Sequence, residues 1–317
     1  MGTWCHNDDQ QLGFMNVVGA AISELEAKRP GIVPNLRSAH SIFIGSDYGG
    51  AHKGAFYEVL TFLVCDPKTL APWDIARRRV RERLLSDGRR MSYKTLNDRV
   101  RRRALRQYLA ACNLIPGLVV TVAIDKRIQS LFVKTGHVSL EAQTAKMFSD
   151  CTAATIERTL RVTHFVSLLL RGLCAPGQDV LWITDEDELV ANEFRLRRFV
   201  EIFASISSNY LEHDLGHLKI GTTQSDTGKR DLEDLIAVCD LCAGSLQDVL
   251  REDAMRMLLN CPSIWIPRVT TNKSKVSEIM DWFADDTQPL KRVVFVIDEI
   301  EQSQELRLTP LRFHGSN

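Results

Sequence analysis

Residues 41–50, Ser-Ile-Phe-Ile-Gly-Ser-Asp-Tyr-Gly-Gly, join a short apolar run to an acidic residue and a glycine turn. The apolar part, 41–46, predicts a buried strand, and Asp47 with the two glycines predicts the turn that ends it. The stretch 180–188 repeats this pattern, because Val-Leu-Trp-Ile-Thr runs directly into four consecutive acids. Two apolar strands that each end in acidic residues place carboxylates at strand ends.

The rest of the chain alternates between strand-like and helix-like patterns. Further strands are predicted at 55–65, 118–124, 217–223, 293–297 and 307–313, and helices at 16–28, 74–85, 96–111, 139–173, 188–210, 231–250 and 275–283. This alternation predicts an α/β fold in three layers, with a central sheet flanked by helices. We divide the chain into a main domain, 1–250, and an α/β extension, 251–317, packed on the same domain.

The overall composition is that of an ordinary globular protein. The 317 residues include 40 Lys+Arg and 40 Asp+Glu, and 44% are hydrophobic. A net charge of zero excludes a protein that coats nucleic acid through its total positive charge. No apolar run reaches the ~18 residues that span a bilayer, and the N-terminus lacks a signal-peptide pattern. We therefore expect a cytoplasmic protein with no membrane contact, whose eight cysteines are reduced.

The neutral total hides two segments of opposite charge. Residues 77–106 contain thirteen basic and three acidic residues, a local charge of +10, whereas 173–193 contains six acids and no Lys or Arg. The basic segment predicts an arginine-rich helical insertion at 77–111 that contacts a nucleic-acid backbone. The candidate contacts are Arg89, Arg90, Arg99, Arg101, Arg102 and Arg103. The alternative is a solvated helical hairpin beside an acidic loop.

Three aspartates are candidates for a metal site. Asp47 and Asp185 end predicted strands, and Asp240 lies in the apolar helical segment 236–244, IAVCDLCAG. A buried carboxylate is costly unless it is paired or binds a cation, so Asp240 is expected to face inward. Converging carboxylates can hold two Mg²⁺ or Mn²⁺ ions for phosphoryl displacement. The alternatives are that Asp47 forms a turn and that Asp185 caps the following helix.

These segments also resemble a known family. The run 42–50 resembles the strand and "DESG" opening of an uncharacterised RNase H-like family of bacteria, and 238–244 is similar to its "QxADxxAG" motif. The strand 180–185 is similar to its acid-terminated middle strand, and 92–94 resembles its "ExK" element. The resemblance covers about 41–247. It implies an RNase H-like fold with a mixed sheet, with Asp47, Asp185 and Asp240 as catalytic metal ligands and Lys94 near the scissile phosphate.

The chain departs from this family at three positions. Tyr48 and Ser92 stand where the motifs have Glu, and Ala237 stands where they have Gln. Glu186 or Asp187 could supply the missing acid to the metal.

The expectation from sequence is a Mg²⁺- or Mn²⁺-dependent nuclease or phosphodiesterase that cleaves DNA or RNA. At the level of the family, such enzymes are associated with bacterial anti-phage defence and mobile elements. The alternative is a weakened RNase H-like subunit that binds nucleic acid or acts as a scaffold. A homodimer or a larger protein complex is compatible with either function.

Other motifs favour structural roles. The run 294–299 resembles a Walker B strand, but 223–230 lacks the glycine and the Ser/Thr of a phosphate loop. Cys239 and Cys242 are expected to be small buried side chains rather than zinc ligands. Trp182 is expected in the core, and His52 in a solvated loop near Asp47.

Overall fold

The computed structural model describes residues 3–6, 8–132, 152–185, 189–251, 264–266, 274–300, 303 and 305–313. Within these ranges, eight strands form one sheet in the order β5-β4-β1-β2-β3-β7-β8-β6. The strands are β1 (Ser41–Gly49), β2 (Tyr57–Cys65), β3 (Gly117–Asp125), β4 (Asp179–Thr184), β5 (Leu218–Thr222), β6 (Ile264–Ile266), β7 (Leu290–Glu299) and β8 (Leu306–Phe313).

The sheet is mixed. β2 is antiparallel to both β1 and β3, whereas β4 is parallel to β1 and β5 is parallel to β4. Beyond β3 the sheet continues with parallel β7 and antiparallel β8, with β6 parallel to β8. Every residue of β2 and β3 is buried, because helices cover both faces of the sheet.

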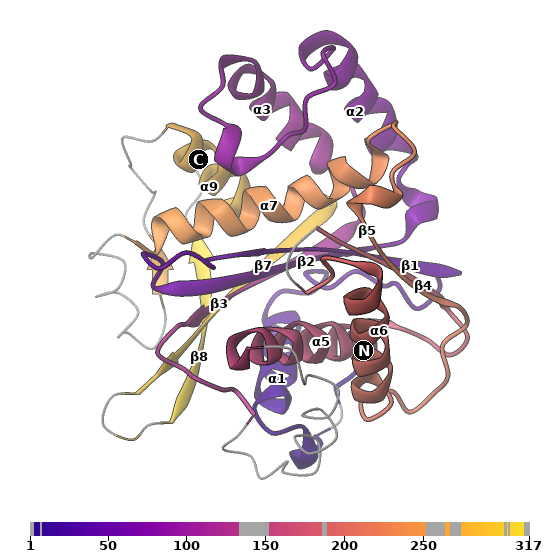
Figure 1. The fold of residues 1–317 in the computed structure, drawn as a ribbon, viewed down its shortest axis with the longest axis vertical. Helices are drawn as coiled ribbons and strands as arrows, with labels where there is room; N and C mark the ends of the chain where they lie inside the picture. The colour runs from indigo at the N-terminus through magenta and orange to yellow at the C-terminus, as the bar shows by residue number, and fades with distance from the viewer. Residues whose placement is uncertain are drawn as a thin grey trace.

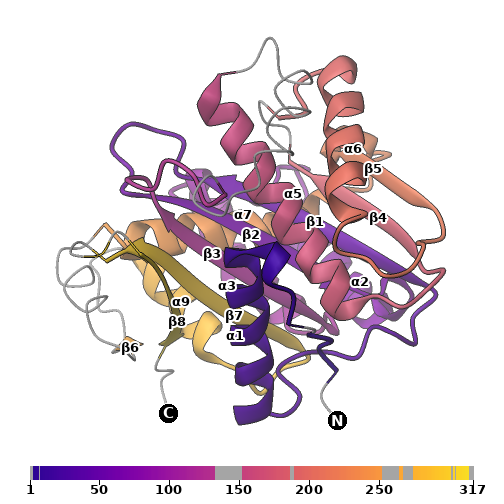
Figure 2. The same ribbon diagram turned by 90° about the horizontal axis from the view of Figure 1, so that it is seen from below.

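Helices form a layer on each side of the sheet (Figures 1 and 2). On one face lie α7 (Asp231–Val249), α9 (Ser274–Ala284), α2 (Ala71–Leu84) and α3 (Arg99–Cys112). On the other face lie α1 (Phe14–Lys28), α5 (Ala153–Leu173) and α6 (Glu193–Ser207). Alternate residues of one strand serve the two cores, since Phe43 packs with the α7 side and Ile44 with the α5 side. The predicted α/β architecture with a mixed central sheet between helices is confirmed.

Figure 1 shows how the arginine-rich insertion is placed. α7 lies directly over the sheet, and α2 and α3 lie beyond it. Amphipathic patterning explains the docking of α3, because Leu105, Tyr108 and Leu109 are buried while most of its arginines lie on the other side. The insertion is therefore packed onto α7.

The structure bears on two of the predicted helix boundaries. The helix predicted at 188–210 begins at Glu193, because Asn192 has an extended backbone and its side chain accepts a hydrogen bond from the Arg195 N–H. The idea that Asp185 caps this helix is therefore wrong. Of the helix predicted at 139–173, residues 139–151 lie outside the described residues, and α5 begins after the capping residue Thr152.

The described residues bear on two further sequence expectations. None of the described helices combines the length and apolar character needed to cross a bilayer. The six cysteines within the described ranges carry free thiols.

Candidate active site

A cavity of about 960 Å³ lies where the carboxyl ends of β1 and β4 meet α7. Its lining includes all four predicted catalytic residues, Asp47, Asp185, Asp240 and Lys94. Asp47 and Asp240, which are 193 positions apart in the sequence, are brought together because parallel β1 and β4 end at the same edge of the sheet and α7 crosses above them. Ligands of open α/β sheets bind at this kind of edge, where the chain order reverses around a central strand.

A close approach between α7 and β1 positions Asp240. Gly45 of β1 allows this approach, since a Cβ there would lie 2.9 Å from Cδ1 of Ile236, which would have to shift. The Cys239 thiol lies 3.5 Å from the Gly45 carbonyl oxygen. The helix thus packs against the strand backbone, and its next residue, Asp240, lines the same cavity as Asp47.

Asp240 is held by the segment that joins α2 to α3. The backbone N–H of Tyr93 donates to its carboxylate at 2.7 Å, and the Ser92 hydroxyl donates a second bond. Burial raises the pKa of Asp240, and the negative charge of Asp185 raises it further; the two hydrogen bonds and the Lys94 charge act in the opposite direction. A carboxylate that carries this desolvation cost is stabilised by a nearby cation.

Tyr93 fixes the short helix η3 (Tyr93–Thr95) on α7. Its hydroxyl donates to Asp248 at 2.7 Å, and the Lys275 ammonium lies 4.1 Å from the centre of its ring. The ring rests on Gly244, where any Cβ would overlap it. The contact between Gly244 and Tyr93 therefore sets the distance of Ser92 and Lys94 from Asp240.

We expect Gly244→Ala to destabilise the protein by about 1–3 kcal/mol, because the added methyl group forces the Tyr93 ring away from α7. The Tyr93 N–H should then no longer reach Asp240. In a double-mutant cycle measured by urea unfolding, the same substitution in a Tyr93→Ala background should cost less than about 0.5 kcal/mol. An equal cost in both backgrounds would mean that the strain lies elsewhere.

The pairing of β1 with β4 fixes the position of Asp185, and the side chain of Asp185 contacts Arg90. Its N–H donates to the Ser46 carbonyl at 3.1 Å, which continues the β1–β4 pairing. The Arg90 guanidinium lies 3.3 Å from its carboxylate and 3.6 Å from that of Glu233. The Thr223 hydroxyl is 3.4 Å from the same Asp185 oxygen.

Two acids that the sequence analysis did not select also line the cavity. Glu233 and Asp248 belong to α7, seven residues before and eight residues after Asp240. These spacings are close to two helical turns, so all three acids share one helix face. The spacing of these acids in the sequence was the signal from which Glu233 and Asp248 could have been predicted as members of the site. Glu186 and Asp187 lie outside the described residues.

The donor set is suited to hard cations with open coordination positions. Within the described ranges, no three Asp, Glu, His or Cys side chains form a group that could enclose one metal ion. Mg²⁺ commonly binds through one or two carboxylates, with waters and substrate phosphates completing its shell. Asp47, Asp185 and Asp240 offer such oxygen ligands around one cavity.

Most of the predicted nucleic-acid contacts are already paired within the protein. Arg89 pairs with Asp87 and Asp98, and Arg102 lies 2.6 Å from Glu278. Arg101 lines the cavity and donates to the Arg90 carbonyl at 2.7 Å.

Arg99 and Arg103 differ from these, because both are exposed and form no ion pair with the described residues. Arg106 shares this property and follows them on the same helix face. The outward basic surface of α3 is thus Arg99, Arg103 and Arg106.

The other motifs have structural roles. Trp182 is fully buried and its indole N–H donates to the Ser46 hydroxyl at 2.9 Å, so the expected core role is confirmed. Cys239 and Cys242 are buried, and burial raises the pKa of both thiols. Asp298, in the Walker B-like strand, forms an ion pair with Arg307 at 2.6 Å.

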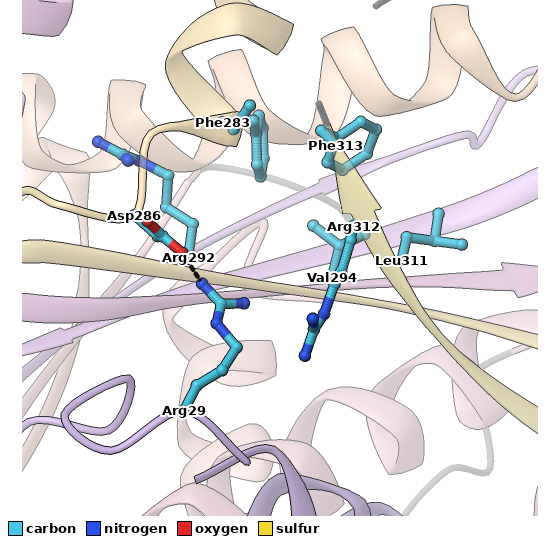
Figure 3. A pocket seen from close by; sticks show the side chains of 9 residues that line it. Arg29, Phe283, Asp286, Arg292, Val294, Leu311, Arg312 and Phe313 are labelled. Atoms are coloured by element: carbon cyan, nitrogen blue, oxygen red, sulfur yellow. Dashed lines mark hydrogen bonds and ion pairs between the residues drawn. The ribbon is translucent and has the colours of Figure 1, made fainter. Parts of the chain in front are cut away.

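A second, smaller cavity of about 110 Å³ lies between α9 and the β7–β8 pair (Figure 3). Its basic residues have partners, since Arg29 pairs with Asp286. Arg292 is buried against the Trp282 ring and donates to Asn113 and to the Asp285 carbonyl. Burial lowers the pKa of Arg292 to about 10. The arginines of this cavity therefore have a structural role, because their contacts help to pack α9 on the sheet.

Comparison with known proteins gives no assignment. No protein-family model, curated protein or solved structure matches this chain. The function is therefore inferred from the cavity itself.

Proposed function

We propose that the protein is a metal-dependent nuclease or phosphodiesterase that cleaves DNA or RNA at the cavity formed by β1, β4 and α7. The observation that carries this proposal is the convergence of Asp47, Asp185, Asp240 and Lys94 on one cavity. Its charged lining is mixed, because five carboxylates lie among six Lys and Arg side chains. Such a cavity can attract both cations and phosphates.

Strand order supports an RNase H-like form of the fold. In the order β3-β2-β1-β4-β5, only β2 runs against the other four strands. This is the arrangement that the family resemblance implies. Asp47 on the central strand, Asp185 after its parallel neighbour and Asp240 on the helix after β5 also follow the order implied by the family motifs.

Each group has a role in this proposal. Asp47, Asp185 and Asp240 would hold Mg²⁺ or Mn²⁺, with one or two of these carboxylates on each ion, and the metal would supply an activated water and stabilise the leaving oxygen. Lys94 and Arg101 contact substrate phosphate as fixed positive charges. Ser92, where the family motif has Glu, donates a hydrogen bond to Asp240 and thereby orients that carboxylate.

The direct test is hydrolysis of single- and double-stranded DNA and RNA by the purified chain with Mg²⁺, Mn²⁺ or EDTA. Cleavage that requires the metal and is lost on combined substitution of Asp47, Asp185 and Asp240 by Asn supports the proposal. Absence of metal-dependent cleavage on all four substrates argues against it.

One observation favours a second function, a nucleic-acid-binding or scaffold subunit. The Arg90 guanidinium lies between Asp185 and Glu233 and neutralises part of the acidic cluster without a metal. Ser92 also stands where the family motif has Glu. An arginine that pairs with the acids and a missing acid are both expected of a site that no longer binds metal ions. Binding of nucleic acid without any Mn²⁺ binding would select this function.

The outward basic surface of α3 should dominate the salt dependence of nucleic-acid binding. Replacing Arg99, Arg103 and Arg106 by Ala should lower the slope of log K against log salt by about 2–3 on duplex DNA, since each lost phosphate contact removes about 0.9. Arg102→Ala is the matched control, because Arg102 pairs with Glu278 and should change the slope by less than about 0.9. Binding can be measured by fluorescence anisotropy at several salt concentrations, and an unchanged slope in the triple variant would assign this surface to another partner.

A further inference from the structure

The segment between α2 and α3, residues 85–98, is here called the strap. It places the positively charged side chain of Arg90 on the acidic side of the cavity. Arg90 is the residue of this strap that contacts Asp185 at 3.3 Å and Glu233 at 3.6 Å. Arg90 is thus paired with the Asp185 carboxylate, which would have to be open for a metal ion to bind there. The same guanidinium is a good ligand for phosphate oxygens, because its planar donors match them.

The backbone of the strap is fixed while the Arg90 side chain is accessible. Arg81 donates to the Arg89 carbonyl at 3.0 Å, and Arg101 donates to the Arg90 carbonyl at 2.7 Å. The Tyr93 N–H is bonded to Asp240. By contrast, the Arg90 side chain is 45% exposed, and ion pairs of this exposure are held weakly. The side chain can therefore change partner without movement of its backbone.

Neither carboxylate depends on Arg90 for its hydrogen bonds. Glu233 also pairs with Arg230, and Asp185 also contacts the Thr223 hydroxyl. Departure of Arg90 would leave Glu233 neutralised and would open Asp185 to a cation.

We propose that Arg90 exchanges between Asp185 and the substrate phosphate, and that this exchange couples metal binding to nucleic-acid binding. The inference rests on the proposed function, because it assumes that Asp185 binds the metal. With nucleic acid absent, Arg90 competes with the metal. When a phosphate backbone enters the cavity, Arg90 moves to it and the metal binds more tightly. Linkage requires the reciprocal effect, so the metal also strengthens nucleic-acid binding by the same factor.

The experiment measures Mn²⁺ affinity by calorimetry, with and without a phosphorothioate oligonucleotide, which keeps its backbone charge and resists cleavage. In the wild type, the oligonucleotide should tighten Mn²⁺ binding about three- to fivefold, as expected for release of one exposed ion pair. Arg90→Ala should bind Mn²⁺ about that much more tightly without the oligonucleotide and should show no further gain with it. Arg90→Lys, which keeps the charge but lacks the planar donors, should show coupling between that of the wild type and that of Arg90→Ala.

Arg78→Ala is the matched control. Arg78 is an exposed arginine of α2 that pairs with Asp74 at 2.7 Å, away from the cavity lining. Its removal should leave both Mn²⁺ affinities unchanged. Thermal unfolding of each variant checks that it is folded.

The outcomes separate this inference from the proposed function. If Asp185→Asn weakens Mn²⁺ binding but Arg90→Ala matches the wild type in affinity or in coupling, the exchange by Arg90 is wrong and the metal site stands. If Mn²⁺ does not bind the wild type, or binds equally after Asp185→Asn, the metal site at Asp185 fails and the inference fails with it.

Discussion

Replacement of Asp240 by Asn should lower metal-dependent cleavage about 100-fold or more, equivalent to about 3 kcal/mol of lost transition-state stabilisation. The amide keeps a carbonyl oxygen that can accept the Tyr93 N–H bond but loses the negative charge that holds a cation. Asp248→Asn is the matched control, because Asp248 lies on the same face of α7 and receives the Tyr93 hydroxyl. An equal loss in the two variants would point to a general disturbance of η3.

The same substitution should leave stability unchanged or raise it. The pKa of Asp240 is raised by burial, so between the ordinary value of 3.8 and the raised value the folded state binds more protons than the unfolded state. Stability contributed by this group is therefore present at low pH and is lost as pH rises through that window. In urea unfolding with EDTA, the wild type should lose stability relative to Asp240→Asn as pH increases. A difference between the two proteins that does not vary with pH would contradict this assignment.

Much of the sheet could be predicted from local patterns. The middle parts of β3 and β7, residues 118–124 and 293–297, are apolar except for Thr121, because both faces of the sheet are covered. The start of α6 was misplaced because the acids at 185–188 look like a helix N-terminus, whereas the residue that caps the helix is Asn192. Several residues could serve as caps, and only the backbone conformation decides which one does.

The candidate site was predictable in part. The order of Asp47, Asp185 and Asp240 along the chain suggested a common edge, and these residues do line one cavity. The pairing of the arginines was not visible, because their partners are distant in sequence. Arg77 and Asp234, for example, are 157 residues apart, so the local charge of +10 overstates the charge that faces solvent.

The largest effect on stability is expected from Asp234→Ala, about 3–5 kcal/mol. Asp234 is 1% exposed and binds two arginines of α2, with Arg77 at 3.1 Å and Arg81 Nε at 2.7 Å. Both guanidinium groups lie between α2 and α7 and are largely buried. The carboxylate of Asp234 compensates their positive charge. Removal of Asp234 leaves two buried positive charges with too few partners, and the cost of desolvating them is no longer offset.

Asp231→Ala provides the comparison that isolates burial. Asp231 is on the same helix and pairs with the same Arg77, but it is 44% exposed, so its loss should cost less than about 1 kcal/mol. Both variants can be measured by urea unfolding at neutral pH. Because α2 carries the strap to η3, Asp234→Ala should also weaken the Tyr93 contact with Asp240, and proteolysis within 85–98 should become faster. Equal costs for the two substitutions would show that the α2–α7 interface is held by apolar contacts of the core that includes Trp73 and Leu235, and that the buried ion pairs add little.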